Sequence, residues 1–285
     1  MRRVGAEAAP GAGTRACLDV RDEAAFAAGH LAGSGHLPHG EFRERRAELP
    51  ARERPVLVVA DDPRQADAAA AELEAMGYAD VEVLEVPLAA VPSGHASRGP
   101  AARLWQPAPF LAEVLPHVLP PEGGHPGPAA DLAAGSGREA VFLALHGFDV
   151  EAWDHAPEAL ARATALARRN GVAIRTHVAD LEREDHRLGA GRYGLIVVFR
   201  FLHRPLFPFI ERALAPGGWL VYETYRAGQA RIGRPTHRRF LLEDGELASA
   251  FPGLRVVRYE EPAPPGGPIT ARLLAFKPGE RREMP

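Results

Sequence analysis

Hydrophobic and polar positions alternate along this chain in blocks that favour a parallel sheet covered by helices. Residues 55–60, 129–133 and 193–199 are short apolar runs of the kind that is buried on both faces of a parallel strand. Alanine- and leucine-rich segments with helical spacing of their polar residues occur at 64–76 and 157–167. Strands that alternate with helices in this way predict an α/β fold.

The other predicted elements continue this alternation. Further strands are expected at residues 17–20, 81–84, 149–153, 172–178, 219–223, 254–260 and 269–276. Further helices are expected at residues 22–28, 110–118, 138–146 and 206–214. The last two strands follow one another without a helix between them, so they should form an antiparallel hairpin at the edge of the sheet.

Two domains are expected from the length of 285 residues and from a break in the pattern. Residues 89–102 lack periodicity and are rich in small residues, which is typical of a linker. The predicted organisation is a small parallel-sheet domain at residues 1–88, the linker at 89–102, a larger α/β domain at 103–276 and a tail at 277–285.

Composition narrows the function classes. The net charge of −3 provides no global field for nucleic acid or an anionic membrane, and the apolar runs are too short to cross a bilayer. Met1 is not followed by the apolar run of a secretory signal. Cys17 is the only cysteine, so neither an internal disulfide nor a cysteine-rich zinc site is expected, and a reducing bacterial cytoplasm is the simplest compartment. No metal is predicted.

A glycine-rich turn between a predicted strand and a predicted helix is the most informative motif. Gly135-Ser136-Gly137 follows the strand that contains Asp131, and the next strand ends beside Asp154. A turn without β-carbons lets backbone N–H groups approach a ligand at the positive end of a helix dipole. A carboxylate at Asp154 can accept hydrogen bonds from two ribose hydroxyls. This layout predicts a nucleoside site on a doubly wound, Rossmann-like sheet.

Two cofactors fit the glycine turn. Residues 135–140 match the G-x-G-x-x-A pattern of NAD-binding proteins. Asp131 precedes the turn where a carboxylate can meet the amino-acid part of S-adenosylmethionine, and Asp180 follows a third strand where it can accept from an adenine amino group. A Pro-Gly-Gly turn at 215–218 and the terminal hairpin suit a seven-stranded methyltransferase sheet. These features favour S-adenosylmethionine.

On these motifs, residues from about 103 to 276 resemble a class I S-adenosylmethionine-dependent methyltransferase, closest to the small bacterial branch that includes the tellurite-resistance methyltransferases. Ala133 stands where the family's first motif has a glycine, and it is not counted as a contact. The resemblance implies that Asp131 and the glycines surround the methionine and ribose, that Asp154 binds the ribose hydroxyls and that Asp180 lies at the adenine. The predicted cofactor contacts are Asp131, Gly135, Ser136, Gly137, Asp154, His155, Asp180, Leu181 and Phe199.

The methyl acceptor is expected at the carboxyl ends of the fourth and fifth strands. His203 is the candidate base or orienting group, and Glu223 or Tyr225 could position the acceptor. Trp105, before the first helix of the domain, could cap the cofactor or belong to the core. Residues 226–239 carry five arginines and no acid; beside a pocket, this run would favour an anionic acceptor. A small molecule, rather than nucleic acid, is the expected acceptor.

The first domain resembles a rhodanese-like domain over residues 16–88. The resemblance rests on Leu-Asp-Val-Arg at 18–21, Gly-His-Leu-Ala-Gly at 29–33 and Pro-Val-Leu-Val-Val at 55–59. Sulfurtransferases of this family carry a persulfide on a cysteine after the last of these segments, and here that position is Ala60. Alanine has no nucleophile, so the domain is expected to be inactive and kept for docking or regulation.

The expected function is therefore methyl transfer from S-adenosylmethionine to a small molecule, by a chain whose rhodanese-like domain is inactive. Two alternatives stay open. Both domains could be binding or sensing modules that hold the cofactor without turnover, or the chain could be an NAD-dependent oxidoreductase.

Overall fold

The computed structural model describes residues 2–5, 15–85, 93–119, 127–183 and 188–279. The chain divides into two compact units, Met1–Gln106 and Pro107–Pro285. This boundary lies beyond the predicted linker at 89–102. Strand β7 (Ala96–Ser97) pairs antiparallel with β3 (His30–Leu31), and Leu104 is buried in the core of the first unit. The later part of the predicted linker is therefore part of the first unit, while residues 86–92 lie outside the described residues.

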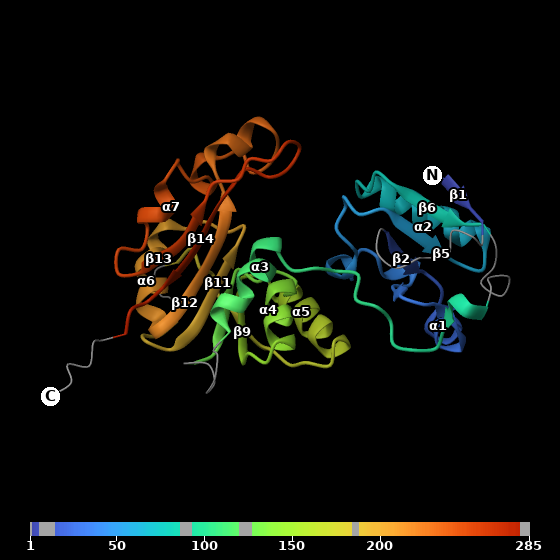
Figure 1. Ribbon diagram of the computed structural model, residues 1–285, viewed down its shortest axis with the longest axis horizontal. Coiled ribbons are helices and arrows are strands. Elements are labelled where there is room, and N and C mark those ends of the chain that lie inside the picture. Colours follow the sequence, from blue (N-terminus) through green and yellow to red (C-terminus); the bar gives the residue numbers. More distant parts are fainter. Residues whose placement is uncertain (1, 6–14, 86–92, 120–126, 184–187, 280–285) are drawn as a thin grey trace. The chain divides into compact units, whose positions relative to one another are not determined.

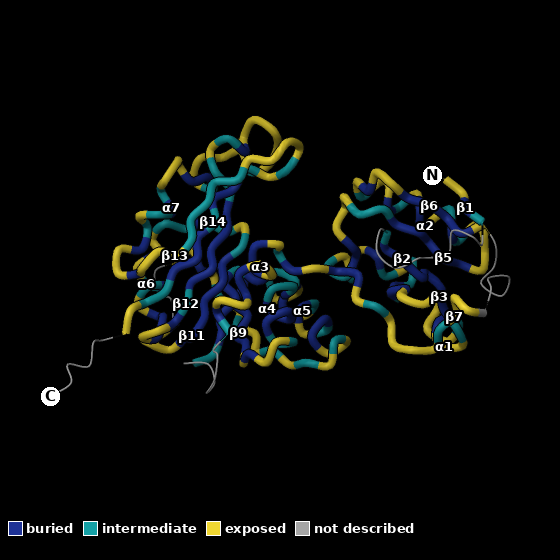
Figure 2. Tube along the Cα trace, in the orientation of Figure 1, coloured by how far each residue is buried: buried dark blue, intermediate teal, exposed yellow. Residues whose placement is uncertain are grey.

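The first unit is built around a five-stranded parallel sheet (Figure 1). Its strands, in spatial order, are β1 (Arg2–Val4), β6 (Val81–Leu84), β5 (Val56–Val59), β2 (Ala16–Asp19) and β4 (Gly35–His36). Its helices are α1 (Glu23–Ala28) and α2 (Pro63–Ala75). All four residues of β2, β5 and β6 are buried, as expected for parallel strands covered on both faces (Figure 2). The edge strand β1 has two exposed residues in three and was not predicted.

The second unit contains a seven-stranded mixed sheet. Its strands, in spatial order, are β10 (Arg175–Val178), β9 (Val150–Asp154), β8 (Ala129–Leu132), β11 (Tyr193–Phe199), β12 (Leu214–Tyr225), β14 (Thr270–Phe276) and β13 (Arg255–Glu260). The first five are parallel to one another, and β14 runs antiparallel to both β12 and β13. The predicted α/β class, the seven strands and the edge hairpin are confirmed.

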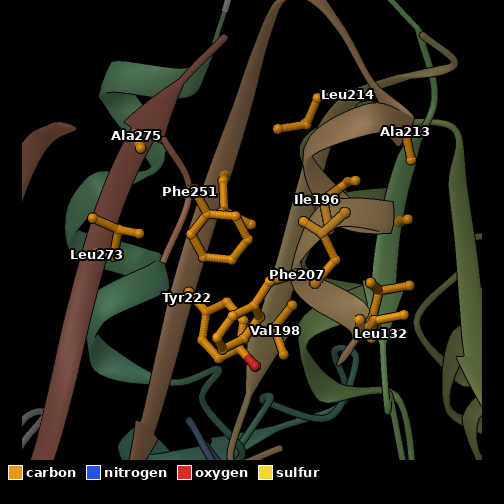
Figure 3. Close-up of a cluster of buried hydrophobic side chains, with 14 of the residues drawn as sticks. Leu132, Ile196, Val198, Phe207, Ala213, Leu214, Tyr222, Phe251, Leu273 and Ala275 are labelled. Carbon is orange, nitrogen blue, oxygen red and sulfur yellow. The ribbon is translucent and has the colours of Figure 1, made fainter. Parts of the chain in front are cut away.

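Helices cover both faces of this sheet. They are α3 (Pro109–Val118), α4 (Arg138–Leu145), α5 (Pro157–Arg169), α6 (Phe207–Ala213) and α7 (Glu246–Ser249). Helices α6 and α7 lie on one face, and α3, α4 and α5 lie on the other (Figure 1). Side chains that alternate along the strands, such as Ile196 and Val198, pack against Phe207 of α6 and Phe251 in one hydrophobic cluster (Figure 3). Among the described residues, no helix combines the length and apolar character needed to span a membrane.

The order of the strands positions the functional site. Strand β8 lies between β9, which follows it in sequence, and β11, which follows much later. The strand order therefore reverses at β8 and β11, and ligands of doubly wound sheets bind beyond the carboxyl ends of the strands at such a point. The glycine turn leaves β8 at this edge.

Two predicted elements differ in detail. The Pro-Gly-Gly segment at 215–218 is an irregularity within β12, because Tyr193 pairs with Leu214 while Leu195 already pairs with Trp219. Gly217 has a φ of 81° there, which a residue with a β-carbon rarely adopts. The predicted strand at 172–178 begins only at Arg175.

Candidate functional site

The turn after β8 has a left-handed backbone at three positions. Ala133, Gly135 and Gly137 have φ angles of 61°, 54° and 76°. A β-carbon on Gly137 would lie 2.5 Å from Cβ of Ala163 on α5, so glycine is required there for packing as well as for conformation. A β-carbon on Gly135 would meet nothing within 4 Å. The turn therefore packs tightly against α5 at one glycine and is open at the other.

Asp154 holds this turn to the end of β9. One carboxylate oxygen accepts from the backbone N–H of Gly135 at 2.8 Å, and the other accepts from the N–H of Ala156 at 2.9 Å. The residue is 7% exposed. Each carboxylate oxygen has two lone pairs, so each can accept one further hydrogen bond. Asp154 can thus order the turn and bind two hydroxyl groups at the same time.

Asp131 lies deeper than the turn. It is 2% exposed, and its carboxylate accepts from the backbone N–H of Ala140 at 3.0 Å. Burial raises its pKa well above the usual range; the charges of Glu139 and Asp154 act in the same direction, and the Ala140 hydrogen bond opposes them. Asp131 braces the first turn of α4 and does not line the cavity described next.

A cavity of about 360 Å³ opens at the carboxyl ends of β8, β9 and β10. Four of its lining residues are predicted contacts, namely Asp154, His155, Asp180 and Leu181. The other four, which the sequence analysis did not include, are Ala133, Ala179, Glu182 and Phe201. Its volume is within the range of small-molecule sites.

The structure explains why Ala133 and Phe201 line the cavity although they were not predicted contacts, and why the predicted contact Ser136 does not. Ala133 lines the cavity because the chain turns there with a positive φ. An alanine in the sequence does not indicate this backbone conformation. Phe201, rather than the predicted Phe199, lines the cavity, since Phe199 is still within β11 and pairs with Glu223. Ser136 is the acceptor of a 3.4 Å hydrogen bond from Arg162 and, like Gly135 and Gly137, is not among the residues that line the cavity.

The cavity suits a cationic nucleoside. Asp154, Asp180 and Glu182 provide carboxylates, while Leu181 and Phe201 provide apolar surface for a flat ring. Asp180 is exposed, and one of its oxygens accepts from the N–H of Glu182 at 3.0 Å. An adenine ring, a ribose and a positively charged sulfur are all compatible with these groups. The residues present therefore fit S-adenosylmethionine.

The predicted acceptor residues lie at the same edge of the sheet. Glu223 pairs with Phe199 across β11 and β12, and Tyr225 ends β12. Burial raises the pKa of Glu223, while the nearby charges of Arg272 and Arg200 lower it. His203 precedes the short 3₁₀ helix Arg204–Leu206 and is half-buried. Trp105 is buried and falls within the first unit.

Acids from other segments balance much of the arginine run at 226–239. Arg226 pairs with Asp244 at 2.6 Å and with Glu261 at 2.9 Å. Arg238 pairs with Glu243, and Arg239 lies 3.9 Å from Glu182 at the cavity. Pairing of three of the five arginines weakens the case for an anionic acceptor, which rested on a run without acids.

The loop after β5 in the first unit has no side-chain nucleophile and is rich in acid. Ala60 is buried, and Asp62 caps helix α2 by accepting from the N–H of Arg64 at 2.9 Å. Pro63 at the start of the helix has no N–H to offer. Arg21 donates to Asp61 at 3.2 Å. The groups that could otherwise bind an anion at this helix terminus are thus occupied by carboxylates.

Cys17 is expected to be unreactive in the folded protein. It is 2% exposed, and its pKa is raised to about 12, first by burial and then by the charge of Asp19. Only the thiolate is nucleophilic. A disulfide reagent such as Ellman's reagent at pH 8 should leave the native thiol unmodified and react with it fully in guanidinium chloride; rapid reaction of the native chain would contradict this assignment.

Comparison with known proteins gives a separate match for each unit. Residues 122–263 match the family model described as tellurite resistance protein TehB. Residues 6–86 match the rhodanese-like domain. These matches correspond to the two resemblances inferred from the sequence motifs.

Curated relatives match parts of the chain. Hemagglutinin 1 of Eikenella corrodens is 29% identical over 165 residues, which cover 52% of this chain and 54% of that protein. The probable S-adenosyl-L-methionine-dependent methyltransferase TehB of Haemophilus influenzae is 31% identical over 80 residues, or 28% of each. Thiosulfate sulfurtransferase GlpE of Pseudomonas putida is 41% identical over 66 residues, which cover 22% of this chain and 57% of the relative. The chain thus spans only about half, or less, of the first two relatives.

Solved structures overlap the second unit. A crystal structure of an S-adenosylmethionine-dependent methyltransferase from Mesorhizobium loti is 22% identical and covers 60% of this chain and 99% of its own, with a TM-score of 0.48. The crystal structure of TehB from Haemophilus influenzae is 21% identical and covers 53% and 58%, with a TM-score of 0.46.

Proposed function

We propose that this chain transfers a methyl group from S-adenosylmethionine to a small molecule, because residues 122–263 match the TehB family model and residues 6–86 match the rhodanese-like domain. The observation that carries the proposal is the cavity beside β8, where Asp154 holds the glycine turn and still has lone pairs for two hydroxyls. We place this activity in the cytoplasm, because the single cysteine is a buried free thiol.

Each residue of the site would contact a different part of the cofactor. Asp154 would accept from the ribose hydroxyls, and Asp180 with Leu181 would hold the adenine. Phe201, two residues after the end of β11, would present its ring to the positive charge of the cofactor. S-adenosylmethionine brings an already activated methyl group on a sulfonium. The protein therefore needs mainly to orient the acceptor and exclude water.

Calorimetric titration of the full chain with S-adenosylmethionine, S-adenosylhomocysteine and NAD tests the cofactor assignment. The two sulfur compounds should bind, and NAD should not. Binding of NAD alone would support the oxidoreductase alternative and defeat the proposal. Release of S-adenosylhomocysteine in the presence of thiols, small acids, tellurite or selenite would then separate an enzyme from a cofactor-binding protein without turnover.

We also propose that the rhodanese-like domain is catalytically inactive and serves docking or regulation. Two features support this proposal: the missing nucleophile at Ala60, and the carboxylates of Asp61 and Asp62 beside it. A sulfur anion would meet negative charge at this loop.

Restoring the cysteine alone should not restore sulfur transfer. The Ala60→Cys variant is expected to show only background thiosulfate–cyanide sulfurtransferase activity, because neighbouring carboxylates disfavour both a thiolate and thiosulfate. The variant that also carries Asp61→Ser and Asp62→Ser should be at least about tenfold more active, since it removes both charges. Full activity of Ala60→Cys by itself would show that the acids do not block the loop.

A further inference from the structure

A second cavity lies in the second unit, and the proposed methyl transfer does not use it. Its volume is about 360 Å³, and it opens between α6 and the segment that follows α7. None of its lining residues lines the cofactor cavity. Lys277 lies at one end of it, just after Phe276, which pairs with Trp219 near the start of the parallel part of β12. We refer to this space as the α6–α7 cavity.

The charged groups of the α6–α7 cavity leave one positive charge without a counter-charge. Its charged lining residues are Arg204, Arg212, Lys277 and Glu211. Arg204 is neutralised by Glu246, because its Nε and Nη2 donate to the two carboxylate oxygens, the latter at 2.8 Å. Two cations then remain against the single carboxylate of Glu211. A ligand with one negative charge would balance the cavity.

Glu211 is already occupied by the backbone of the protein. One of its oxygens accepts from the N–H of Gly253 at 3.1 Å. A β-carbon on Gly253 would lie 2.3 Å from the other oxygen, so the carboxylate is packed directly against this glycine. Glu211 therefore serves to fix the segment after α7 to α6, and it forms no ion pair with the cations of the cavity among the described residues.

Arg212 is the donor that a ligand can reach. The side chain is exposed, and its guanidinium lies over the ring of Phe209, 5.1 Å from the ring centre. It makes no hydrogen bond or ion pair with any side chain that the structure describes. A guanidinium presents its N–H groups in a flat fork that matches the two oxygens of a carboxylate. Arg212 thus offers a carboxylate two parallel hydrogen bonds.

Lys277 adds a fixed positive charge to the same cavity. Its ammonium donates to the carbonyls of Glu211 and Leu214, each at 2.9 Å, and lies 3.5 Å from the carbonyl of Arg212. These carbonyls end α6, where a cation is favourable. No carboxylate within the described ranges pairs with this ammonium. Its charge therefore still attracts an anion that enters the cavity.

The other walls of the α6–α7 cavity are apolar. They are formed by Phe207, Pro208, Ala250 and Pro252. Phe207 is 7% exposed, and its ring packs 5.0 Å from the ring of Phe251 in the hydrophobic cluster of this face (Figure 3). The two prolines have rigid rings that lose little entropy when they are covered. A ligand with an apolar body is therefore favoured over a small hydrated ion.

We propose that the α6–α7 cavity is a second ligand site, which binds a small monocarboxylic acid with a flat apolar body. Its carboxylate would meet Arg212 in the field of Lys277, and its body would cover the apolar walls. A phosphate group carries more than one negative charge at pH 7, so it fits the charge balance less well. The proposal is independent of the methyl transfer, because the two cavities share no lining residue.

Benzoate tests this proposal, with three matched probes. Benzamide and benzamidinium keep the ring but are neutral and cationic, and acetate keeps the charge without the ring. Each is titrated at constant ionic strength into the full chain labelled with ¹³C-lysine. Lys277 is the only lysine, so one lysine signal reports the cavity. It should shift saturably with benzoate, and each of the other probes should bind at least about fivefold more weakly.

Variants of Arg212 separate a specific site from general attraction of an anion. Because Arg212 is exposed, Arg212→Met should keep the Tm and raise the dissociation constant of benzoate at least about fivefold. Arg212→Glu reverses the charge and should abolish the saturable shift. Arg168→Met is the matched control: it removes an exposed arginine from α5, on the other face of the sheet, and should bind benzoate as the parent does (Figure 1).

Each contrary result overturns the proposal. Absence of a saturable shift with benzoate would show that the cavity holds no such acid. Equal affinity for benzoate and benzamide would show that the cations do not select a carboxylate, and unchanged affinity in Arg212→Met would exclude the assigned contact. The lysine signal reports this cavity whether or not the chain binds S-adenosylmethionine, so failure of the proposed function would leave the test intact.

Discussion

Replacing Asp154 with alanine should weaken S-adenosylhomocysteine binding by about 100-fold, which corresponds to about 2.7 kcal/mol. The carboxylate holds the N–H groups of Gly135 and Ala156 and is proposed to accept from both ribose hydroxyls. Hydrogen bonds to a charged group contribute about 1.5–3 kcal/mol each, so an effect of about 2.7 kcal/mol is a lower estimate for the loss of two to the ligand. Calorimetric titration of the folded variant measures it.

Two further variants make this result specific. Asp154→Asn keeps the shape and one accepting oxygen, so it should show an intermediate loss. Asp149→Asn removes a carboxylate just before β9 at the opposite end of that strand, where it is exposed and paired with Arg175, and it should bind as the parent does. Equal affinity of Asp154→Ala and the parent would mean that the ribose lies elsewhere.

Replacing Gly137 with alanine should cost the second unit about 3 kcal/mol of stability and lower its Tm by about 6–12 °C. The new β-carbon would lie 2.5 Å from Cβ of Ala163, and the φ of 76° is unfavourable for alanine. Differential scanning calorimetry of the parent and the variant measures the change.

Gly135→Ala is the matched control, because it shares the positive φ but lacks the clash. Its cost should be about 1–2 kcal/mol, the cost of the left-handed conformation alone. Equal losses in the two variants would show that packing against α5 is not what requires glycine at 137.

The parts of the fold that were predictable from sequence depend on local patterning. Apolar runs such as 193–199 and the alternating helices identified the α/β class, and the motif around Gly135 identified the edge of the sheet where the site lies. The register of β12 was not predictable, because the irregularity at 215–218 arises from pairing with β11 and not from the Pro-Gly-Gly residues alone. The pairing of β7 with β3 inside the predicted linker was not predictable, because β7 is only two residues long.

The residues that line the cavity differ in the same way. Asp154 and Asp180 could be placed at this edge from the sequence, because Asp154 ends β9 and Asp180 comes two residues after the end of β10. Phe201 and Glu182 were not, since they reach the cavity through the path of the chain after a strand has ended. Asp131 was predicted as a contact, whereas the structure shows it bracing α4 at Ala140; whether it also meets the cofactor stays a prediction.

The sequence by itself determined the two family resemblances, the cofactor class that they imply and the alanine at position 60, because these depend on residue identity at fixed spacing along the chain. Only the tertiary structure decided that Thr270 and Arg272 lie beside Glu223, since residues almost fifty positions apart become neighbours through antiparallel pairing of β12 with β14. It likewise decided that Ala133 lines the cavity and that acids distant in sequence pair with the arginine run. Hydrogen-bond satisfaction and charge balance are properties of neighbours in space, and a linear pattern does not contain them.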